Sequence, residues 1–369
     1  MKIPQFDLTR QYERLEPEVE AALRHVLRSG RFILGPEGEA FEAECAAYLG
    51  VSHAIGLGSG SDAIELILQG LGVGPDTEVV TPAFSFVASA TAALRLGARP
   101  VFVDVEPATL TIDPDRVVAA ITPRTRAILA VHIYGLPAAM GPLRVLAEAH
   151  GVHLVEDAAQ AFGAILGGRP VGGHGRAAAF SFYPTKNLGA YGDAGLVTTT
   201  DPTLAAHLRL ARNHGQTQKY RHAELGWTAR LDELQAAILR VKLCHLPEWT
   251  RARQAIAARY SAGLAGLPVV LPAERPGATH VFHQYTLRTP RRDALAAHLA
   301  AAGIGTAWHY PLPIPAQPLF RDLGYDATPF PAAWAAAREV LSLPCFPELR
   351  SDEIDAVIAA VRDFFEGDP

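Results

Sequence analysis

Short apolar segments alternate with amphipathic segments between residues 53 and 199, and this alternation restricts the fold more than any other feature of the sequence. Helical patterns at 63–68, 87–96 and 141–150 separate several of the apolar segments. Strands that alternate with helices form a mostly parallel sheet with helices on its faces. The sequence therefore predicts an α/β protein with a doubly wound sheet. The predicted strands span residues 53–57, 78–81, 100–104, 127–132, 152–155, 177–182 and 195–199.

The rest of the chain predicts a second, smaller unit. Helical patterns at 11–29, 36–49 and 202–212 flank the sheet, and a long helix is expected to begin near Gly226 and to end near Leu243, before Pro247. We therefore expect a large domain at 1–246 and a small C-terminal α+β domain at 247–369. The predicted elements of the small domain are helices at 248–264, 291–302, 329–340 and 351–365, and strands at 282–287 and 305–309.

Composition excludes several classes of protein. The formal net charge of -5 argues against nucleic acid as the main partner and gives no sign of a basic surface for membranes. Cys45, Cys244 and Cys345 are scattered, so their spacing does not suggest a metal site. The sequence begins without an apolar signal segment, and no run of about 18 apolar residues would span a membrane. We therefore expect a cytoplasmic protein without a metal.

In open α/β sheets, functional sites form beyond the carboxyl ends of the strands. The side chains that follow predicted strands are therefore candidates: Ser61, Phe86, His132, Asp157 and Lys186. Lys186 lies on a turn rich in proline and glycine, directly after an apolar strand. Its amine becomes a nucleophile where the surroundings lower its pKa. The alternative is an ordinary surface lysine in a loop.

The stretch from Gly58 to Asp62 joins a strand to a helix and predicts an anion site. The N–H groups at the start of a helix are unpaired and lie at the positive end of its dipole, and Ser61 adds a hydroxyl. The glycines do not fit the dinucleotide pattern GxGxxG, and no phosphate-binding GxxxxGK[ST] is present. The alternative is a plain turn with Ser61 or Asp62 as helix N-cap. Asp157 has a similar alternative, as N-cap of a following helix.

Pyridoxal phosphate (PLP) is a cofactor that would use most of these residues together. It needs an anion site, a lysine, an acid facing the pyridine nitrogen, and flat packing against the ring. A carboxylate beside the ring nitrogen favours its protonated form, which is the better electron sink. Lys186 would also act as general base. The sequence offers Gly60, Ser61, Asp62 and Ser181 for the phosphate, Lys186 for the imine, Asp157 for the nitrogen, and Phe86 with Ala159 for the ring faces.

These motifs resemble those of the DegT/DnrJ/StrS nucleotide-sugar aminotransferases, a group with the aspartate-aminotransferase-like fold (fold type I). The resemblance covers nearly the whole chain, and its most specific part is the pair Asp157-Ala-Ala-Gln160 and Pro184-Thr-Lys186-Asn-Leu-Gly189. It also includes Gly35-Pro36, Gly60-Ser61-Asp62-Ala63, Ser85-Phe86, His132-Ile-Tyr-Gly135, Arg212-Asn-His-Gly215, Gln235-Ala-Ala237 and Ser342-Leu-Pro344.

The resemblance implies a role for each matched residue. Lys186 would form the internal aldimine, Asp157 would pair with the pyridine nitrogen, and Gln160 would bond the ring hydroxyl. Phe86 would stack on the ring, while Ser61, the Asp62 backbone and Ser181 would hold the phosphate. The resemblance also implies a homodimer, an amino acid donor (usually glutamate) and a nucleotide-linked keto-hexose acceptor. Arg230, His309 and Tyr310 are the candidate substrate contacts.

Two positions depart from the family pattern. Thr228 stands where the family usually has an asparagine that reaches the neighbouring subunit's phosphate, and Pro315 stands where a histidine is common. Two alternative functions are compatible with the same fold. Sugar dehydratases of the same group carry histidine in place of the lysine, so Lys186 argues against that reaction. A regulatory or ligand-sensing protein on the same fold would not need Lys186, Asp157 and Gln160 together.

Overall fold

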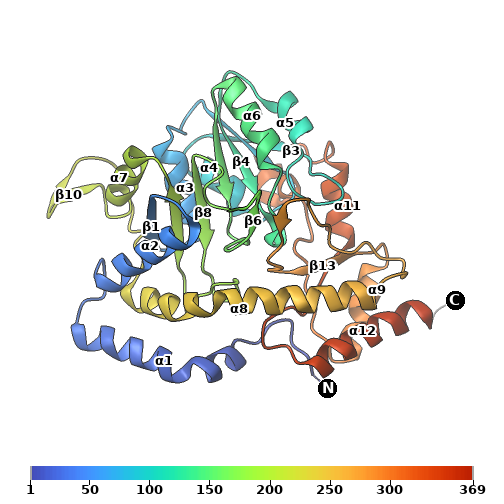
Figure 1. The fold of residues 1–369 in the computed structure, drawn as a ribbon. Helices are drawn as coiled ribbons and strands as arrows, with labels where there is room; N and C mark the ends of the chain where they lie inside the picture. Colours follow the sequence, from blue (N-terminus) through green and yellow to red (C-terminus); the bar gives the residue numbers. More distant parts are fainter. Residues whose placement is uncertain (1, 368–369) are drawn as a thin grey trace.

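A seven-stranded sheet forms the centre of the molecule in the computed structural model, which describes residues 2–367 (Figure 1). Strand β9 is antiparallel to both of its neighbours, β1 and β8, and the other neighbouring strands are parallel. The α/β prediction is therefore confirmed. The order of strands is β1 (His53–Leu57), β9 (Gly195–Thr199), β8 (Ala177–Ser181), β5 (His153–Asp157), β4 (Thr125–Val131), β2 (Glu78–Pro82) and β3 (Arg99–Val103).

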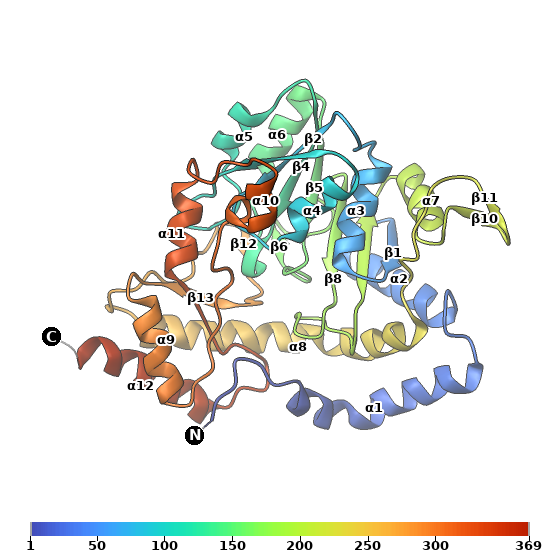
Figure 2. The ribbon, with the colours of Figure 1, turned by 180° about the vertical axis from the view of Figure 1, so that it is seen from behind.

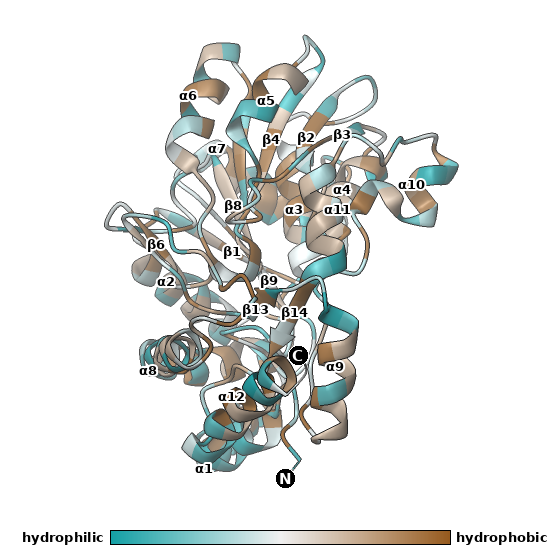
Figure 3. Cartoon of the chain, turned by 90° about the vertical axis from the view of Figure 1, so that its right-hand side faces the viewer, coloured by the Kyte–Doolittle hydropathy of each residue, from teal (hydrophilic) through white to brown (hydrophobic). Residues whose placement is uncertain are grey.

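Helices cover both faces of the sheet (Figures 1 and 2). Val79 and Leu129 pack with α3 and α4 on one face, whereas Val80 and Ile128 pack with α6 on the other. Successive side chains of a strand point to opposite faces, so both faces are buried. Figure 3 shows the resulting apolar sheet and the largely polar outer helix α1. The helices that precede α8 (Glu233–Gly263) in the chain are α1 (Leu8–Ser29), α2 (Pro36–Leu49), α3 (Gly60–Gly70), α4 (Ala88–Arg95), α5 (Pro114–Ala120), α6 (Met140–His150) and α7 (Pro202–Ala211), of which α1 packs on α8 and not on the sheet.

The predicted helix break at Pro247 is wrong. Helix α8 (Glu233–Gly263) is continuous and contains Pro247. A proline inside a helix loses a hydrogen bond, but packing offsets that loss. Leu246 and Trp249, on either side of the proline, are buried. The helix passes from the large sheet to the C-terminal elements (Figures 1 and 2). The division into domains 1–246 and 247–369 stays a prediction, with its boundary inside α8.

The C-terminal part contains the antiparallel pair β13 (Tyr285–Arg288) and β14 (Val340–Leu343). The predicted strand at 305–309 is wrong. Only Ala307 bridges to Ser342, because the Gly305 N–H donates to the Ile3 carbonyl instead. Ile3 packs in the core of this part, which ties both ends of the chain together. The helices here are α9 (Arg292–Ala301), α10 (Pro318–Asp322), α11 (Pro331–Glu339) and α12 (Ser351–Glu366), with 3₁₀ turn η2 (Ile314–Ala316), which includes Pro315.

Several short elements were not predicted. The hairpin of β10 (Gln216–Gln218) and β11 (Arg221–His222) projects from the body of the protein (Figures 1 and 2). The others are η1 (Ile133–Gly135) and the small sheet of β6 (Ile165–Leu166), β7 (Arg169–Pro170) and β12 (Ala278–Thr279), together with α5, η2, α10 and β14. Within residues 2–367, none of the helices combines the length and the apolar character needed to cross a bilayer.

Candidate active site

A cavity of about 520 Å³ lies at the carboxyl ends of the parallel strands and collects most of the predicted site residues. Asp62 and Arg230 are not among its lining residues. The Asp62 N–H is bonded to the Ser59 hydroxyl, and the Arg230 guanidinium donates to Asn213 Oδ1 at 3.0 Å. The predicted residues that do line the cavity are Gly60, Ser61, Phe86, Asp157, Ala159, Gln160, Ser181, Lys186, His309 and Tyr310.

The N-terminus of α3 faces Ser181 at the end of β8. The helix N-cap is Ser59, whose hydroxyl accepts from the Asp62 N–H at 3.1 Å, so the alternative that placed Ser61 or Asp62 in that role is wrong. A side chain at Gly60 would lie 2.7 Å from the Ser181 Cβ, so only glycine allows this close approach. Ser61 and Ser181 therefore offer hydroxyls beside a helix N-terminus, an arrangement suited to a phosphate.

Asp157 ends β5 and is 5% exposed. Its Oδ2 accepts from the Ser89 hydroxyl at 2.8 Å, and its Oδ1 accepts from the Ala159 N–H at 3.2 Å. Residues 158–164 form turns, so the N-cap alternative for Asp157 is wrong. Burial raises the pKa of this carboxyl, and the hydrogen bonds from Ser89 and Ala159 together with the charge of Lys186 oppose that rise. The carboxylate is thus held rigidly at the cavity wall, where a cationic group would stabilise its charge.

Lys186 is held in a tight turn after β8, where its N–H donates to the Tyr183 carbonyl at 2.8 Å. Its side chain lines the cavity and is half-buried, which argues against an ordinary surface lysine. Burial lowers the pKa of the amine to about 8, although the charge of Asp157 acts in the opposite direction. A lysine with a lowered pKa is a better nucleophile near neutral pH, because more of it is uncharged.

This pKa predicts how the unloaded protein reacts with an acylating reagent. Only the neutral amine reacts, so acylation of Lys186 is expected to reach half of its maximal rate near pH 8. The control is a short lysine peptide acylated in the same solution, and its rate is expected to keep rising past pH 10, because the pKa of a lysine in a model peptide is about 10.4. Mass spectrometry separates the peptide that contains Lys186 from the control peptide. Identical pH profiles for the two amines would contradict the lowered pKa of Lys186.

Gln160 connects the cavity to the C-terminal part. Its Oε1 accepts from the Tyr134 N–H at 2.6 Å, and its Nε2 donates to the Tyr310 hydroxyl at 3.0 Å. Tyr134 donates its hydroxyl to the His309 carbonyl. The Phe86 ring lies 6.0 Å from the Tyr310 ring and is half exposed. This network fixes the orientation of Gln160 toward the cavity.

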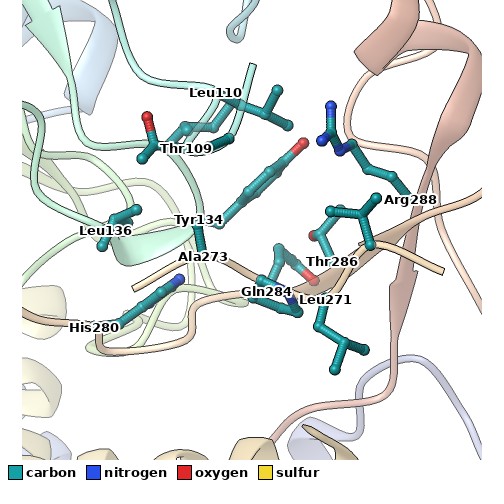
Figure 4. A pocket seen from close by; sticks show the side chains of 14 residues that line it. Thr109, Leu110, Tyr134, Leu136, Leu271, Ala273, His280, Gln284, Thr286 and Arg288 are labelled. Carbon is teal, nitrogen blue, oxygen red and sulfur yellow. The ribbon is translucent and has the colours of Figure 1, made fainter. Parts of the chain in front are cut away.

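Figure 4 shows a second pocket behind Tyr134, with Gln284 and Arg288 on its other side. Its volume is about 30 Å³, the space of roughly one water molecule. Gln284 lines both this pocket and the large cavity. The small pocket is therefore too small for a substrate, and the residues between it and the large cavity form part of the wall of the site.

His132 does not reach the cavity, although it follows a strand as predicted. It is fully buried and pairs with Glu156, with 3.1 Å between His132 Nε2 and Glu156 Oε2. Its Nδ1 accepts from the Ala138 N–H at 3.0 Å. Burial acts to raise the pKa of Glu156, but the hydrogen bonds from His132, Gly172 and Gly175 outweigh that effect, and the pKa is lowered. This pair therefore supports the strand ends from behind the site.

Sequence reasoning missed part of the cavity wall. His283 is 5% exposed, lines the cavity, and its Nδ1 has no hydrogen-bond partner within the described part of the chain. Burial first, and then the charge of Lys186, lower the pKa of His283 well below its ordinary value, so the ring is neutral. A histidine inside an apolar strand pattern was the available signal. Other missed lining residues are Ser59, Ile64, Ser85, Ala88, Val131, Tyr183, Thr185, Asp193, Ala194 and Gln284.

The fold is that of the type I PLP-dependent transferases, as the sequence predicted. The chain belongs to the DegT/DnrJ/EryC1/StrS aminotransferase family, whose model matches residues 13–362. It is 50% identical over 366 residues to a dTDP-3-amino-3,4,6-trideoxy-alpha-D-glucose transaminase of Streptomyces venezuelae, covering 99% of this chain and 97% of the relative. It is also 50% identical over 368 residues to a pleiotropic regulatory protein of Geobacillus stearothermophilus, covering 99% of both chains.

A solved structure gives the same result in three dimensions. The chain superposes with a TM-score of 0.97 on DesV of S. venezuelae in complex with a ketimine intermediate, at 50% identity and with 99% of each chain covered. The family prediction made from the motifs is therefore confirmed.

Proposed function

We propose that this protein transfers an amino group from an amino acid, L-glutamate being the first candidate, to a keto group of a nucleotide-linked hexose. One observation is the main support for the proposal: Lys186, Asp157 and the N-terminus of α3 line the same cavity. The names of the S. venezuelae relatives support both the reaction class and a sugar nucleotide as acceptor.

The residues around the cavity fit PLP. Ser61, Ser181 and the start of α3 would hold its phosphate, and Asp157 would face its ring nitrogen. Phe86 and Ala159 flank the same space, and Gln160 is oriented by Tyr134 and Tyr310. When bound, the cofactor supplies an electron sink for the carbon that gains or loses the amine.

The side chains of this chain then have separate tasks. The Lys186 Nζ would act as general base and move a proton between the substrate carbon that bears the amine and the reacting carbon of the cofactor. The pKa of about 8 leaves enough neutral amine near pH 8 for this role. Asp157, fixed by Ser89 and Ala159, holds a positive charge opposite its carboxylate. His309 and Tyr310 line the same cavity, where they would contact the sugar nucleotide.

A second copy of the chain is proposed to complete the site. Phe32, Ile33 and Leu34 are consecutive exposed apolar residues, and Tyr220 on the projecting hairpin is 82% exposed. A run of exposed apolar residues such as 32–34 is typical of surfaces that contact another protein. Thr228 Oγ1 contacts His214 Nε2 at 3.0 Å on an exposed segment, so any contact across subunits at this position would use a shorter side chain than the family's asparagine. The cytoplasmic location also stays a prediction.

A direct assay tests the function. Incubation of the PLP-loaded protein with L-glutamate and a panel of 3-keto and 4-keto sugar nucleotides is expected to yield 2-oxoglutarate and an amino sugar in equal amounts. Mass spectrometry of the sugar product and an enzymatic assay of 2-oxoglutarate measure both. A matched reaction without the keto sugar is the control, because it measures the 2-oxoglutarate that glutamate yields when no acceptor is present.

The regulatory alternative makes a different prediction. The G. stearothermophilus relative is named a regulatory protein, and this name supports the regulatory alternative. A protein that binds PLP and sugar nucleotide but forms no amino sugar with any donor would contradict the aminotransferase proposal and favour a sensor. Release of water from the sugar without transfer of nitrogen would favour a dehydratase.

A further inference from the structure

Lys242 is a buried lysine that the proposed chemistry does not use. It lies on α8 and its exposed fraction is 0%. Among the 33 lysines and arginines of the chain, lysine stands only at positions 2, 186, 219 and 242. Lysine is rarely buried without a partner, because removing an ammonium group from water destabilises the fold. The partners of Lys242 therefore indicate why a lysine stands there.

Both close contacts of the Lys242 ammonium are with the segment that carries Lys186. Its Nζ donates to the Gly189 carbonyl at 2.8 Å and lies 4.0 Å from the centre of the Tyr191 ring. A hydrogen bond from a charged donor and a cation–π contact are both strengthened where water is excluded. Burial lowers the pKa of Lys242 to about 7, and Glu348 acts against that change.

The turn that contains Lys186 and Gly189 is tight, so a contact that fixes the Gly189 backbone also restricts the backbone of Lys186. The Ala190 N–H donates to the Phe182 carbonyl, and the Lys186 N–H donates to the Tyr183 carbonyl, each at 2.8 Å. A side chain at Gly189 would lie 2.3 Å from the Pro184 carbonyl oxygen. The backbone of the turn therefore has little freedom once Gly189 is fixed.

Helix α8 holds the same segment at a second point. The Tyr191 N–H donates to Gln235 Oε1 at 2.9 Å. Arg240, on the same helix, instead pairs with Glu37 and Glu44 at 2.6 Å each. Lys242 and Gln235 thus contact the segment that carries Lys186, whereas Arg240 contacts α2. Helix α8 runs along the lower edge of the sheet in Figures 1 and 2.

We propose that Lys242 is a positioning residue that fixes the turn carrying Lys186, through the Gly189 carbonyl and the Tyr191 ring, and so sets the position of the Lys186 amine. The proposal rests on the role proposed above for Lys186. The anchoring itself can be measured in the unloaded protein, so failure of the anchoring and failure of the proposed function are distinguishable.

Hydrogen exchange in Lys242→Met tests the anchoring. Methionine keeps most of the side-chain length but removes the nitrogen. The amides of Lys186 and Ala190 in the unloaded protein are expected to exchange at least about tenfold faster than in the wild type, because their turn opens more often. Arg240→Met is the matched control, since it removes a cation from the same helix without touching the turn. Exchange in the control is expected to match the wild type at these amides.

Kinetics of the loaded enzyme give the second readout. In Lys242→Met, kcat is expected to fall about tenfold to a hundredfold while KM for the sugar nucleotide stays within about twofold, as expected when a reacting group is misplaced but substrate contacts remain. Lys242→Gln keeps an N–H donor and is expected to recover part of the lost kcat. A purely structural role would lower the amount of folded enzyme. It would neither lower kcat of the folded enzyme at an unchanged KM nor let Lys242→Gln recover that kcat.

Unchanged exchange at Lys186 and Ala190 in Lys242→Met overturns the proposal, as does an unchanged kcat. If Lys242→Met does not fold, Tyr191→Leu replaces it in the same measurement, and exchange equal to the wild type again overturns the proposal. Faster exchange in a protein that shows no transferase activity with any donor supports the anchoring and contradicts the proposed function.

Discussion

Replacement of Lys186 by alanine is expected to abolish amine transfer, with kcat at least about 1000-fold below the wild type. No other lysine lines the cavity, so no second amine within the described residues can take its place. The loaded wild-type protein is expected to show a visible absorption band that borohydride removes, and the variant is expected to lack this band. Absorption spectra and the paired product assay measure both effects.

Lys2→Ala is the matched control for this variant, because it removes an exposed lysine far from the chemistry in the sequence. It is expected to keep the band and the activity of the wild type. A Lys186→Ala protein that still forms amino sugar at more than a few per cent of the wild-type rate would show that Lys186 is not the reacting amine. The fold of the variant is expected to persist, because Lys186 lies on a turn whose backbone bonds do not involve its side chain.

Replacement of Asp157 by asparagine is expected to give the second-largest effect, a loss of about 100-fold to 10,000-fold in kcat. The amide keeps the size of the side chain and can still bond Ser89 and Ala159, but it carries no charge for the group that faces it. Steady-state kinetics with saturating PLP measure the loss.

Stability is expected to respond differently from activity in this variant. Burial raises the pKa of Asp157, so the folded state favours its neutral form more than the unfolded state does. The charged form therefore destabilises the unloaded protein at neutral pH, and asparagine removes that effect. Thermal unfolding of the unloaded Asp157→Asn protein at pH 7.5 is expected at the wild-type temperature or above it. Asp355→Asn, at an exposed carboxylate on α12, serves as control for both measurements. A large loss of stability with unchanged kcat would contradict the assigned role.

The sequence was sufficient for the sheet because each buried strand is a short apolar run with its own turn signals. Such local patterns survive in any tertiary context that buries both faces. The strand ends then placed Ser61, Asp157 and Lys186 at one edge, since parallel strands end on the same side. His132 followed the same rule but points into the core, where Glu156 pairs with it.

The errors arose where tertiary packing overrode a local signal. Pro247 is an interior helix breaker by itself, but buried neighbours on both sides keep α8 continuous. The segment 305–309 has the composition of a strand, but the Ile3 carbonyl accepts the Gly305 N–H, and only Ala307 pairs with Ser342. Ser61 or Asp62 was the expected N-cap of α3, but the N-cap is Ser59, whose hydroxyl accepts from the Asp62 N–H.

The sequence by itself determined the fold class and the family, and it predicted Lys186, Asp157, Gln160 and Ser181 as site residues, because these inferences depend on local patterns and on residue types at fixed spacing. Only the tertiary structure decided which side chains face the cavity and which support it from behind. Ser89, His283 and Lys242 come from distant segments and acquire their roles through contacts across the fold. Such contacts depend on the burial and orientation of side chains, which no local pattern encodes.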